Sequence, residues 1–126
     1  MQCIVHSRAP WARQRLQAQY AQAFAAHELA ALLLPTTPVI APRIGEDDVF
    51  SLNGHACPTF AMLIRNTDPG SSAGLPGISL PMGLADGLPV GLALDGAAGS
   101  DRTLLAVAAA IEAALPPMPP MPLAPA

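Results

Sequence analysis

Fifteen prolines punctuate this 126-residue chain, and their positions decide where regular structure can form. Proline lacks the backbone N–H and clashes with the preceding helical turn, so helix interiors and central strands exclude it. The prolines leave two long stretches free, residues 11–34 and 90–115. Six of the last eleven residues are proline, so we expect residues 116–126 to form an extended, mobile tail.

Hydrophobic periodicity predicts one helix in each long stretch. In the first, Leu16, Tyr20 and Phe24 recur every four residues and form an apolar stripe on a helix over residues 10–28. In the second, Ser100 or Asp101 can cap a helix that runs to residue 115. A shorter buried helix is predicted over residues 59–65.

Three strands are predicted beside these helices. The continuous apolar run at residues 29–34 could end a buried helix, but its short length favours a buried strand. Residues 78–82 and 88–94 flank the tight connection at residues 85–87 and indicate a β-hairpin or two neighbouring strands. Pro81 and Pro89 are expected near strand ends, where a missing donor costs little. We expect residues 35–58 to have little regular structure and residues 66–77 to form turns. The fold class is therefore α/β: a mixed sheet covered by helices, with about three helices and three strands.

Composition excludes several classes of protein. The formal net charge of −3 argues against a nucleic-acid-binding domain, which usually carries a basic patch. The six basic residues are all arginine, which excludes any mechanism that draws a lysine from this chain. Since no run reaches the roughly 18 apolar residues of a membrane span, we expect no membrane partner.

The cysteines and histidines argue against a metal site or a disulfide scaffold. Cys3 and Cys57 are far apart, which fits a reducing compartment and predicts a cytoplasmic protein. His6, His27 and His55 do not cluster at metal-ligand spacing, so no metal and no cofactor is expected.

Two polar motifs are candidates for chemistry. The serines in Gly70-Ser-Ser-Ala-Gly74 could act as nucleophiles only if His27 or His55 approached them, with Asp68 or Asp95 orienting the base. A Gly-Ser turn is the simpler interpretation. The acidic run at residues 46–48 is better explained as a solvated loop than as a metal site.

Four segments in this order resemble the C-terminal part of the amidase signature family. They are Leu-Pro-Thr-Thr-Pro at 34–38, residues 66–83, residues 87–96 and a helix containing Leu104-Leu105. The resemblance runs from about residue 16 to residue 115, and the block from Gly74 to Gly96 is its most specific part. Residues 64–70 and 94–96 look most like the indoleacetamide and mandelamide hydrolase branch.

The resemblance implies hydrolysis of carboxylic amides by a Ser–cis-Ser–Lys triad through an acyl-enzyme. The triad belongs to the family's N-terminal and central parts, so no catalytic residue maps onto this chain. Residues 10–115 would be the C-terminal part of an amidase domain, preceded by a disordered segment over residues 1–9. By position, the wall of the acyl pocket would include Phe60, Ile64, Thr67 and Leu75.

Three hypotheses follow. The first is a C-terminal amidase segment, inactive alone, whose partners would be a complementary N-terminal half or a second copy, with a small amide such as an aryl-acetamide as substrate. The second is a non-catalytic binding or structural module, inert as an amidase. The third is a self-sufficient Ser–His–Asp hydrolase. Uncovered helix stripes and an open sheet edge are expected to make the isolated chain self-associate.

Overall fold

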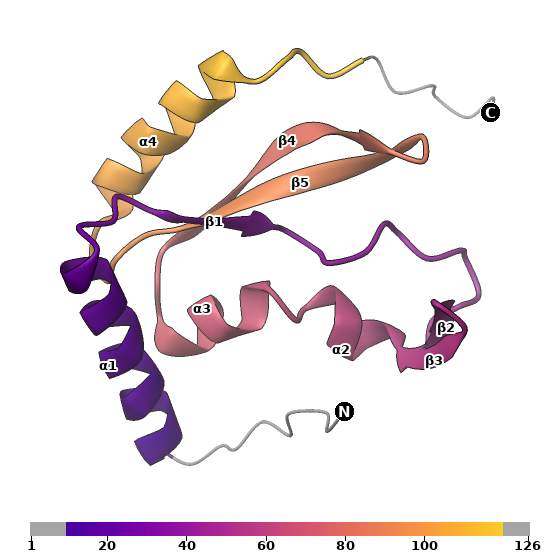
Figure 1. Ribbon diagram of the computed structural model, residues 1–126, viewed down its shortest axis with the longest axis horizontal. Coiled ribbons are helices and arrows are strands. Elements are labelled where there is room, and N and C mark those ends of the chain that lie inside the picture. Colours follow the sequence, from indigo (N-terminus) through magenta and orange to yellow (C-terminus); the bar gives the residue numbers. More distant parts are fainter. Residues whose placement is uncertain (1–9, 120–126) are drawn as a thin grey trace.

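The structure is a computed structural model that describes residues 10–119, with four helices and five strands arranged in two sheets (Figure 1). The predicted α/β class is confirmed, with one helix and two strands beyond those expected. The predicted disordered segment 1–9 and residues 120–126 of the predicted tail lie outside the described residues. Residues 116–119 have no regular secondary structure.

The main sheet has β5 (Leu88–Asp95) at its centre, paired antiparallel with β1 (Leu32–Pro35) on one side and β4 (Gly77–Ala85) on the other. Asp86 and Gly87 join β4 to β5 with φ angles of 51° and 78°. Two successive positive φ angles make a type I′ turn, whose twist matches that of the flanking strands. The predicted hairpin is therefore confirmed.

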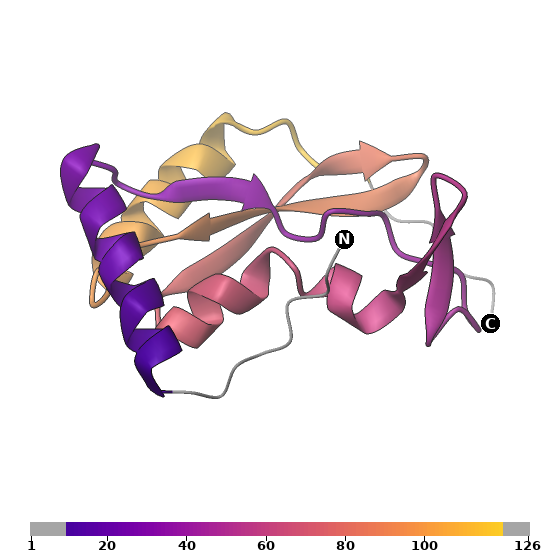
Figure 2. The ribbon, with the colours of Figure 1, turned by 60° about the horizontal axis from the view of Figure 1, so that its bottom comes forward.

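The two faces of this sheet pack against different helices. On one face, α4 (Asp101–Ala114) covers a buried core of Leu80, Leu94, Leu104 and Ala108. Side chains alternate along a strand, so Ala93 and Asp95 of β5 point to the opposite face. There α3 (Thr67–Ala73) runs beneath the sheet, on the side away from α4 (Figures 1 and 2).

Helix α3 occupies a segment for which turns were predicted, and that prediction is wrong. Pro69 lies in the first turn, where its missing N–H would have had no helical partner. Gly74 ends the helix with φ 75°, and the Leu75 N–H donates to the Gly70 carbonyl at 3.0 Å. This Schellman ending satisfies carbonyls of the last turn.

Helix α1 (Pro10–Ala26) packs against α3 at one end of the molecule. The Gln17 side-chain amide donates to the Ala73 carbonyl at 2.9 Å. The predicted stripe points inward, with Phe24 buried and Leu16 and Tyr20 half-buried.

A second, two-stranded sheet lies within residues 35–58, where little regular structure was expected. It pairs β2 (Val49–Leu52) with β3 (His55–Pro58) and leads directly into α2 (Thr59–Leu63). Asn53 and Gly54 form its turn with φ angles of 53° and 79°. Asn-Gly is a strong signal for this type I′ turn, so the hairpin was predictable from the sequence.

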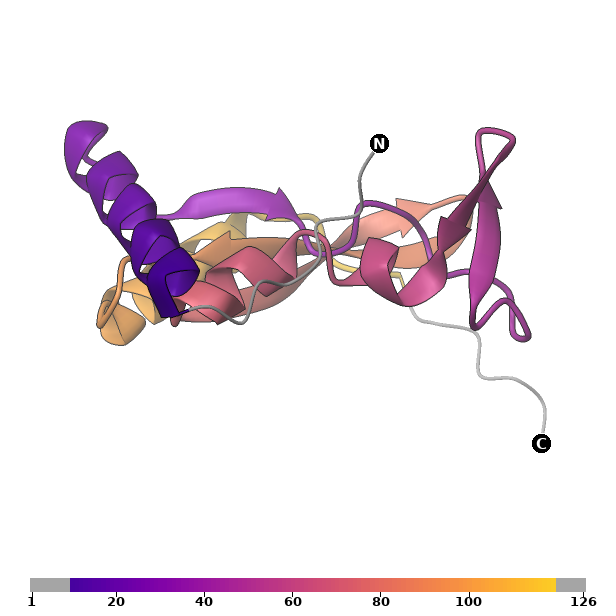
Figure 3. The same ribbon diagram turned by 90° about the horizontal axis from the view of Figure 1, so that it is seen from below.

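The strand β1 is less buried than predicted, because it lies at the edge of the three-stranded sheet and Leu33 is 55% exposed. Trp11 and Phe60 are also exposed, at 65% and 73%. Seen from below, the described part of the chain is flat and elongated (Figure 3). The chain thus leaves a considerable apolar surface uncovered.

Pro81 does not lie near a strand end, as was expected, because β4 is longer than predicted. It lies inside the edge strand, next to a register shift between Pro81 and Gly83. An edge strand with a bulge tolerates the missing proline donor. Pro89, the second residue of β5, does lie near the strand end.

The core between the sheet and α4 predicts a large effect for Leu94→Ala. Leu94 is 0% exposed, so its truncation leaves a cavity and should lower the free energy of unfolding by about 2–5 kcal/mol. Leu105→Ala is the control, since Leu105 is 59% exposed on the same helix that covers Leu94. Urea unfolding followed by circular dichroism should find a large loss in the free energy of unfolding for Leu94→Ala and a small one for Leu105→Ala. Similar losses for both variants would contradict this core.

The contact between α3 and the sheet predicts that Gly70→Ala is destabilising. A Cβ at residue 70 would stand 2.5 Å from Asp95 Oδ2, although alanine in a helix interior normally stabilises by about 0.5–1 kcal/mol over glycine. The atoms in the way belong to the Asp95 side chain. In an Asp95→Ala background, Gly70→Ala should therefore become neutral or stabilising, as measured by thermal midpoints. Equal effects in both backgrounds would disprove the contact.

Candidate functional site

An open cavity of about 290 Å³ lies between α3 and the sheet. Its lining combines a few apolar groups with polar side chains from α3, β4, β5 and the residue that follows β1. The polar members are Thr36, Thr67, Ser71, Ser79 and Asp95, and the others are Leu75, Gly77, Ile78 and Ala93.

Local geometry explains why these residues meet. Thr67 and Ser71 are four residues apart on α3, so they share one helix face. In the antiparallel register, Gly77 is paired with Asp95 and Ser79 with Ala93. Since side chains two residues apart lie on the same face of a strand, the side chains of Ser79, Ala93 and Asp95 face α3, and Gly77 leaves room beside Asp95.

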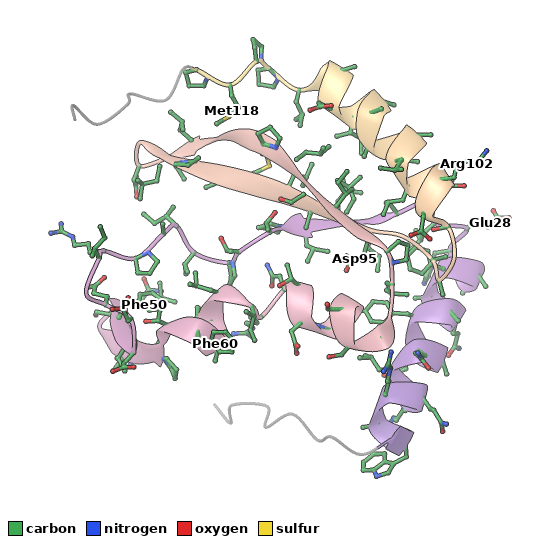
Figure 4. All side chains as sticks on the ribbon, turned by 180° about the vertical axis from the view of Figure 1, so that it is seen from behind. Glu28, Phe50, Phe60, Asp95, Arg102 and Met118 are labelled. Carbon is green, nitrogen blue, oxygen red and sulfur yellow. The ribbon has the colours of Figure 1, made fainter. Side chains whose placement is uncertain are left out.

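Asp95 is the charged member of the cavity lining, and Figure 4 shows it between the sheet and α3. Two glycines make room for its carboxylate, because a Cβ at Gly77 would stand 3.0 Å from Oδ1 and one at Gly70 would come closer still. Among residues 10–119, no hydrogen bond or ion pair to this carboxylate is present.

Burial raises the pKa of the Asp95 carboxyl above its ordinary value, because the charged form loses solvation. The pKa of the Tyr20 phenol on α1 is also raised, first by its own burial and then by the negative charge of Asp95. The carboxylate is therefore a partly desolvated acceptor.

A pair of hydroxyls forms another part of the cavity wall. Thr36 Oγ1 and Ser79 Oγ are 2.5 Å apart and share a hydrogen bond. The Thr36 N–H donates to the Gly91 carbonyl at 2.9 Å, which ties the segment after β1 to β5. A Cβ at residue 91 would stand 2.6 Å from Thr36 Oγ1, so glycine is required beneath this pair.

The four residues predicted for the acyl pocket divide into two groups. Thr67 and Leu75 line the cavity. Ile64 caps the C-terminal end of α2 and is half-buried. Phe60 lies near the start of α2, beside the β2–β3 hairpin, and is exposed to solvent (Figure 4). Neither is part of the cavity lining, and the pocket role of all four stays a prediction.

Sequence reasoning did not select Thr36 or Ser79 as site residues, and it considered Asp95 only as a group that could orient a histidine base. The predicted strand ended at residue 94, yet Asp95 is the last residue of β5. The signal was present in the strand pattern, because alternation places Asp95 on the same face as Ala93, opposite the apolar Leu94. Thr36 and Ser79 carry no comparable signal, since their approach depends on strand pairing.

The Ser–His–Asp arrangement is not assembled in the described residues. Ser71 lines the cavity, but no histidine does. The Ser72 hydroxyl donates to Asp68 Oδ1 at 3.4 Å, and no hydrogen bond in residues 10–119 joins either serine to His27 or His55.

The acidic run lies in a surface loop, with Asp47 and Asp48 exposed, and its backbone holds the start of α2. The Glu46 carbonyl accepts a hydrogen bond of 2.7 Å from the buried Thr59 hydroxyl, and the Asp48 carbonyl accepts one of 3.0 Å from the Thr59 N–H. Within residues 10–119, no group of three or more His, Cys, Asp or Glu side chains could hold a metal ion. In the same range, none of the helices has the length and apolar character of a membrane span.

A larger cavity of about 800 Å³ lies between α1, α3 and residues 97–98, and it shares Leu75 with the first. Its polar side chains are Arg13 and Gln17, and the Gln17 amide is already bonded to α3. The smaller cavity has the denser set of polar side chains and is the better candidate for a binding site.

The raised pKa of Asp95 predicts a pH dependence of stability. The unfolded carboxyl ionises near its ordinary value of 3.8, whereas the folded one ionises at a higher pH. The folded state thus holds more protons in this window, and the free energy of unfolding contributed by Asp95 falls as the pH rises through it. The free energy of unfolding of Asp95→Asn minus that of the parent should therefore be more positive at pH 7 than at pH 3.5. Urea titrations at both pH values test this, with Asp86→Asn in an exposed turn as control. A gain that is the same at both pH values would refute the assignment.

Comparisons with known proteins agree with the resemblance found in the sequence. The Amidase family model matches residues 5–105. The chain is 52% identical over 104 residues to an indoleacetamide hydrolase of Agrobacterium vitis and 42% identical over 106 residues to a mandelamide hydrolase of Pseudomonas putida. Each match covers 82% of this chain, but only 22% and 20% of the respective relative.

A solved amidase crystal structure superimposes with a TM-score of 0.73 at 34% sequence identity, over 82% of this chain and 23% of that one. The matched region is the C-terminal portion of the relatives, as the sequence predicted. The cavity residues and the hairpin β4–β5 lie within the residues that the family model matches, and α4 begins there. The chain therefore belongs to the Amidase family.

Proposed function

We propose that this chain is the C-terminal part of an amidase that hydrolyses carboxylic amides to the acid and ammonia, with aryl-acetamides such as indoleacetamide as substrates. The observation that carries the proposal is the 52% identity to an indoleacetamide hydrolase over 82% of the chain. The chain corresponds to 22% of that relative, so the activity is proposed for an enzyme that includes the rest of the domain.

In this proposal the chain supplies scaffold and one wall of the acyl pocket. The sequence contains no lysine, so the Ser–cis-Ser–Lys triad implied by the family would come from a complementary N-terminal part. Thr67 and Leu75 would contact the acyl group from the cavity between α3 and the sheet. Phe60 and Ile64 on α2 would complete the wall where the N-terminal part covers them.

The exposed apolar side chains support a complementary partner. Leu33 at the sheet edge and Phe60 on α2 are both more than half exposed, and both would be buried by such a part. The cytoplasm is the compartment we propose, on the basis of two cysteines far apart in the sequence; Cys57 is free.

The test is a graft. Residues 10–115 of this chain replace the matching C-terminal portion of the Agrobacterium vitis indoleacetamide hydrolase, and ammonia release from indole-3-acetamide and phenylacetamide is measured. We expect turnover by the graft and none by the 126-residue chain alone. A graft carrying Leu94→Ala controls for folding of the new segment.

A graft that unfolds as cooperatively as the Agrobacterium vitis enzyme but releases no ammonia from either amide would contradict the proposal. It would favour the alternative, a binding or structural module that is inert as an amidase. Turnover by the isolated chain would instead favour a self-sufficient hydrolase and would contradict the assignment of the catalytic groups to another part.

A further inference from the structure

We propose that the cavity between α3 and the sheet binds an N–H or O–H group on the acyl part of the amide, with the Asp95 carboxylate as the acceptor. This inference rests on the proposed function and deepens it by naming the class of acyl group. It would make Asp95 a specificity-determining residue.

The chemistry of the lining favours a hydrogen-bond donor. An ionised carboxylate only accepts hydrogen bonds, and no basic side chain lines this cavity to pair with Asp95. The hydroxyls of Thr67 and Ser71 can also accept, and those of Thr36 and Ser79 already bond to each other. An acyl group with its own carboxylate would be repelled, whereas an N–H or O–H would donate to a partly desolvated acceptor that has no partner within residues 10–119.

The space is kept open by glycines. Gly70 of α3 and Gly77 of β4 stand directly beside the Asp95 carboxylate, and a Cβ at either residue would crowd its oxygens. Because these residues lack a Cβ, the Asp95 carboxylate contacts the backbone side of α3 and β4 directly. Leu75 and Ala93 add apolar surface to the cavity, which suits the ring of an aryl-acetamide.

The size of the cavity favours part of a small molecule. At about 290 Å³ it falls at the lower end of the range for small-molecule sites. The competing occupant is a basic side chain from the N-terminal part of the amidase, which would pair with Asp95 and close the site. That alternative predicts loss of activity on all amides when Asp95 is changed, and the experiment separates the two.

The experiment compares indole-3-acetamide with benzothiophene-3-acetamide, in which sulfur replaces the ring N–H. In the graft described above, the ratio of kcat/KM values should favour the N–H compound about tenfold or more, as for a hydrogen bond to a charged group. Asp95→Leu should reduce this preference to about twofold or less, because it lowers kcat/KM for the N–H compound alone. Asp95→Asn keeps one acceptor oxygen, so its preference for the N–H compound should lie between those of the parent and Asp95→Leu. Asp86→Asn is the matched control, because it removes the same charge in an exposed turn.

A second measurement does not depend on catalysis. The 126-residue chain, labelled with ¹⁵N, is titrated with each of the two amides. Indole-3-acetamide should shift the backbone signals of Ser71 and Asp95 at lower concentration than its sulfur analogue, and Asp95→Leu should abolish that difference.

The outcomes keep the two proposals apart. An active graft in which Asp95→Leu leaves the substrate ratio unchanged, or lowers both rates equally, overturns the inference and leaves the amidase assignment standing. An inactive graft that unfolds as cooperatively as the Agrobacterium vitis enzyme, together with Asp95-dependent binding to the chain, overturns the amidase assignment and supports the site. The same inactive, folded graft with no difference in binding between the two amides overturns both.

Discussion

The alternation of side chains along β5 is the constraint on which the rest of the structure depends. Leu94 points into the core beneath α4, and the next residue, Asp95, points to the cavity beside α3. A shift of one residue in strand register would bury the carboxylate under α4 and turn the leucine toward the cavity. The core and the candidate site are thus fixed by the same strand pairing.

The elements predicted correctly carry local signals. The hairpin β4–β5 has its Asp86-Gly87 turn, and the two long helices have stripes that repeat within a single segment. Helix α3 was missed because its Gly, Ser and Pro residues are typical of turns. Its contacts are tertiary, since it packs against α1 and Gly70 lies against the Asp95 side chain of β5, and no local pattern reveals them. The hairpin β2–β3 was missed although its Asn53-Gly54 turn was visible.

The candidate site was less predictable than the fold. Thr67 and Leu75 were found by position within a resemblance, and both line the cavity. Asp95 is contacted by Gly70 of α3 and Gly77 of β4, which are 25 and 18 residues away in the sequence. Its lack of a partner within residues 10–119 is likewise a tertiary property. Three glycines at positions 70, 77 and 91 shape the cavity, and a Cβ at any of them would crowd a side chain on another element.

The contiguity of β4, β5 and α4 has a consequence for how the chain acquires its structure. The hairpin and the helix that covers it occupy one uninterrupted segment, so their contacts close short loops. β1 pairs with β5 across more than fifty residues, and closing that loop costs more entropy. We expect residues 77–114 to form the earliest structured unit and β1 to join it afterwards. Pulsed hydrogen exchange during refolding would reveal the reverse order if β1 amides were protected first.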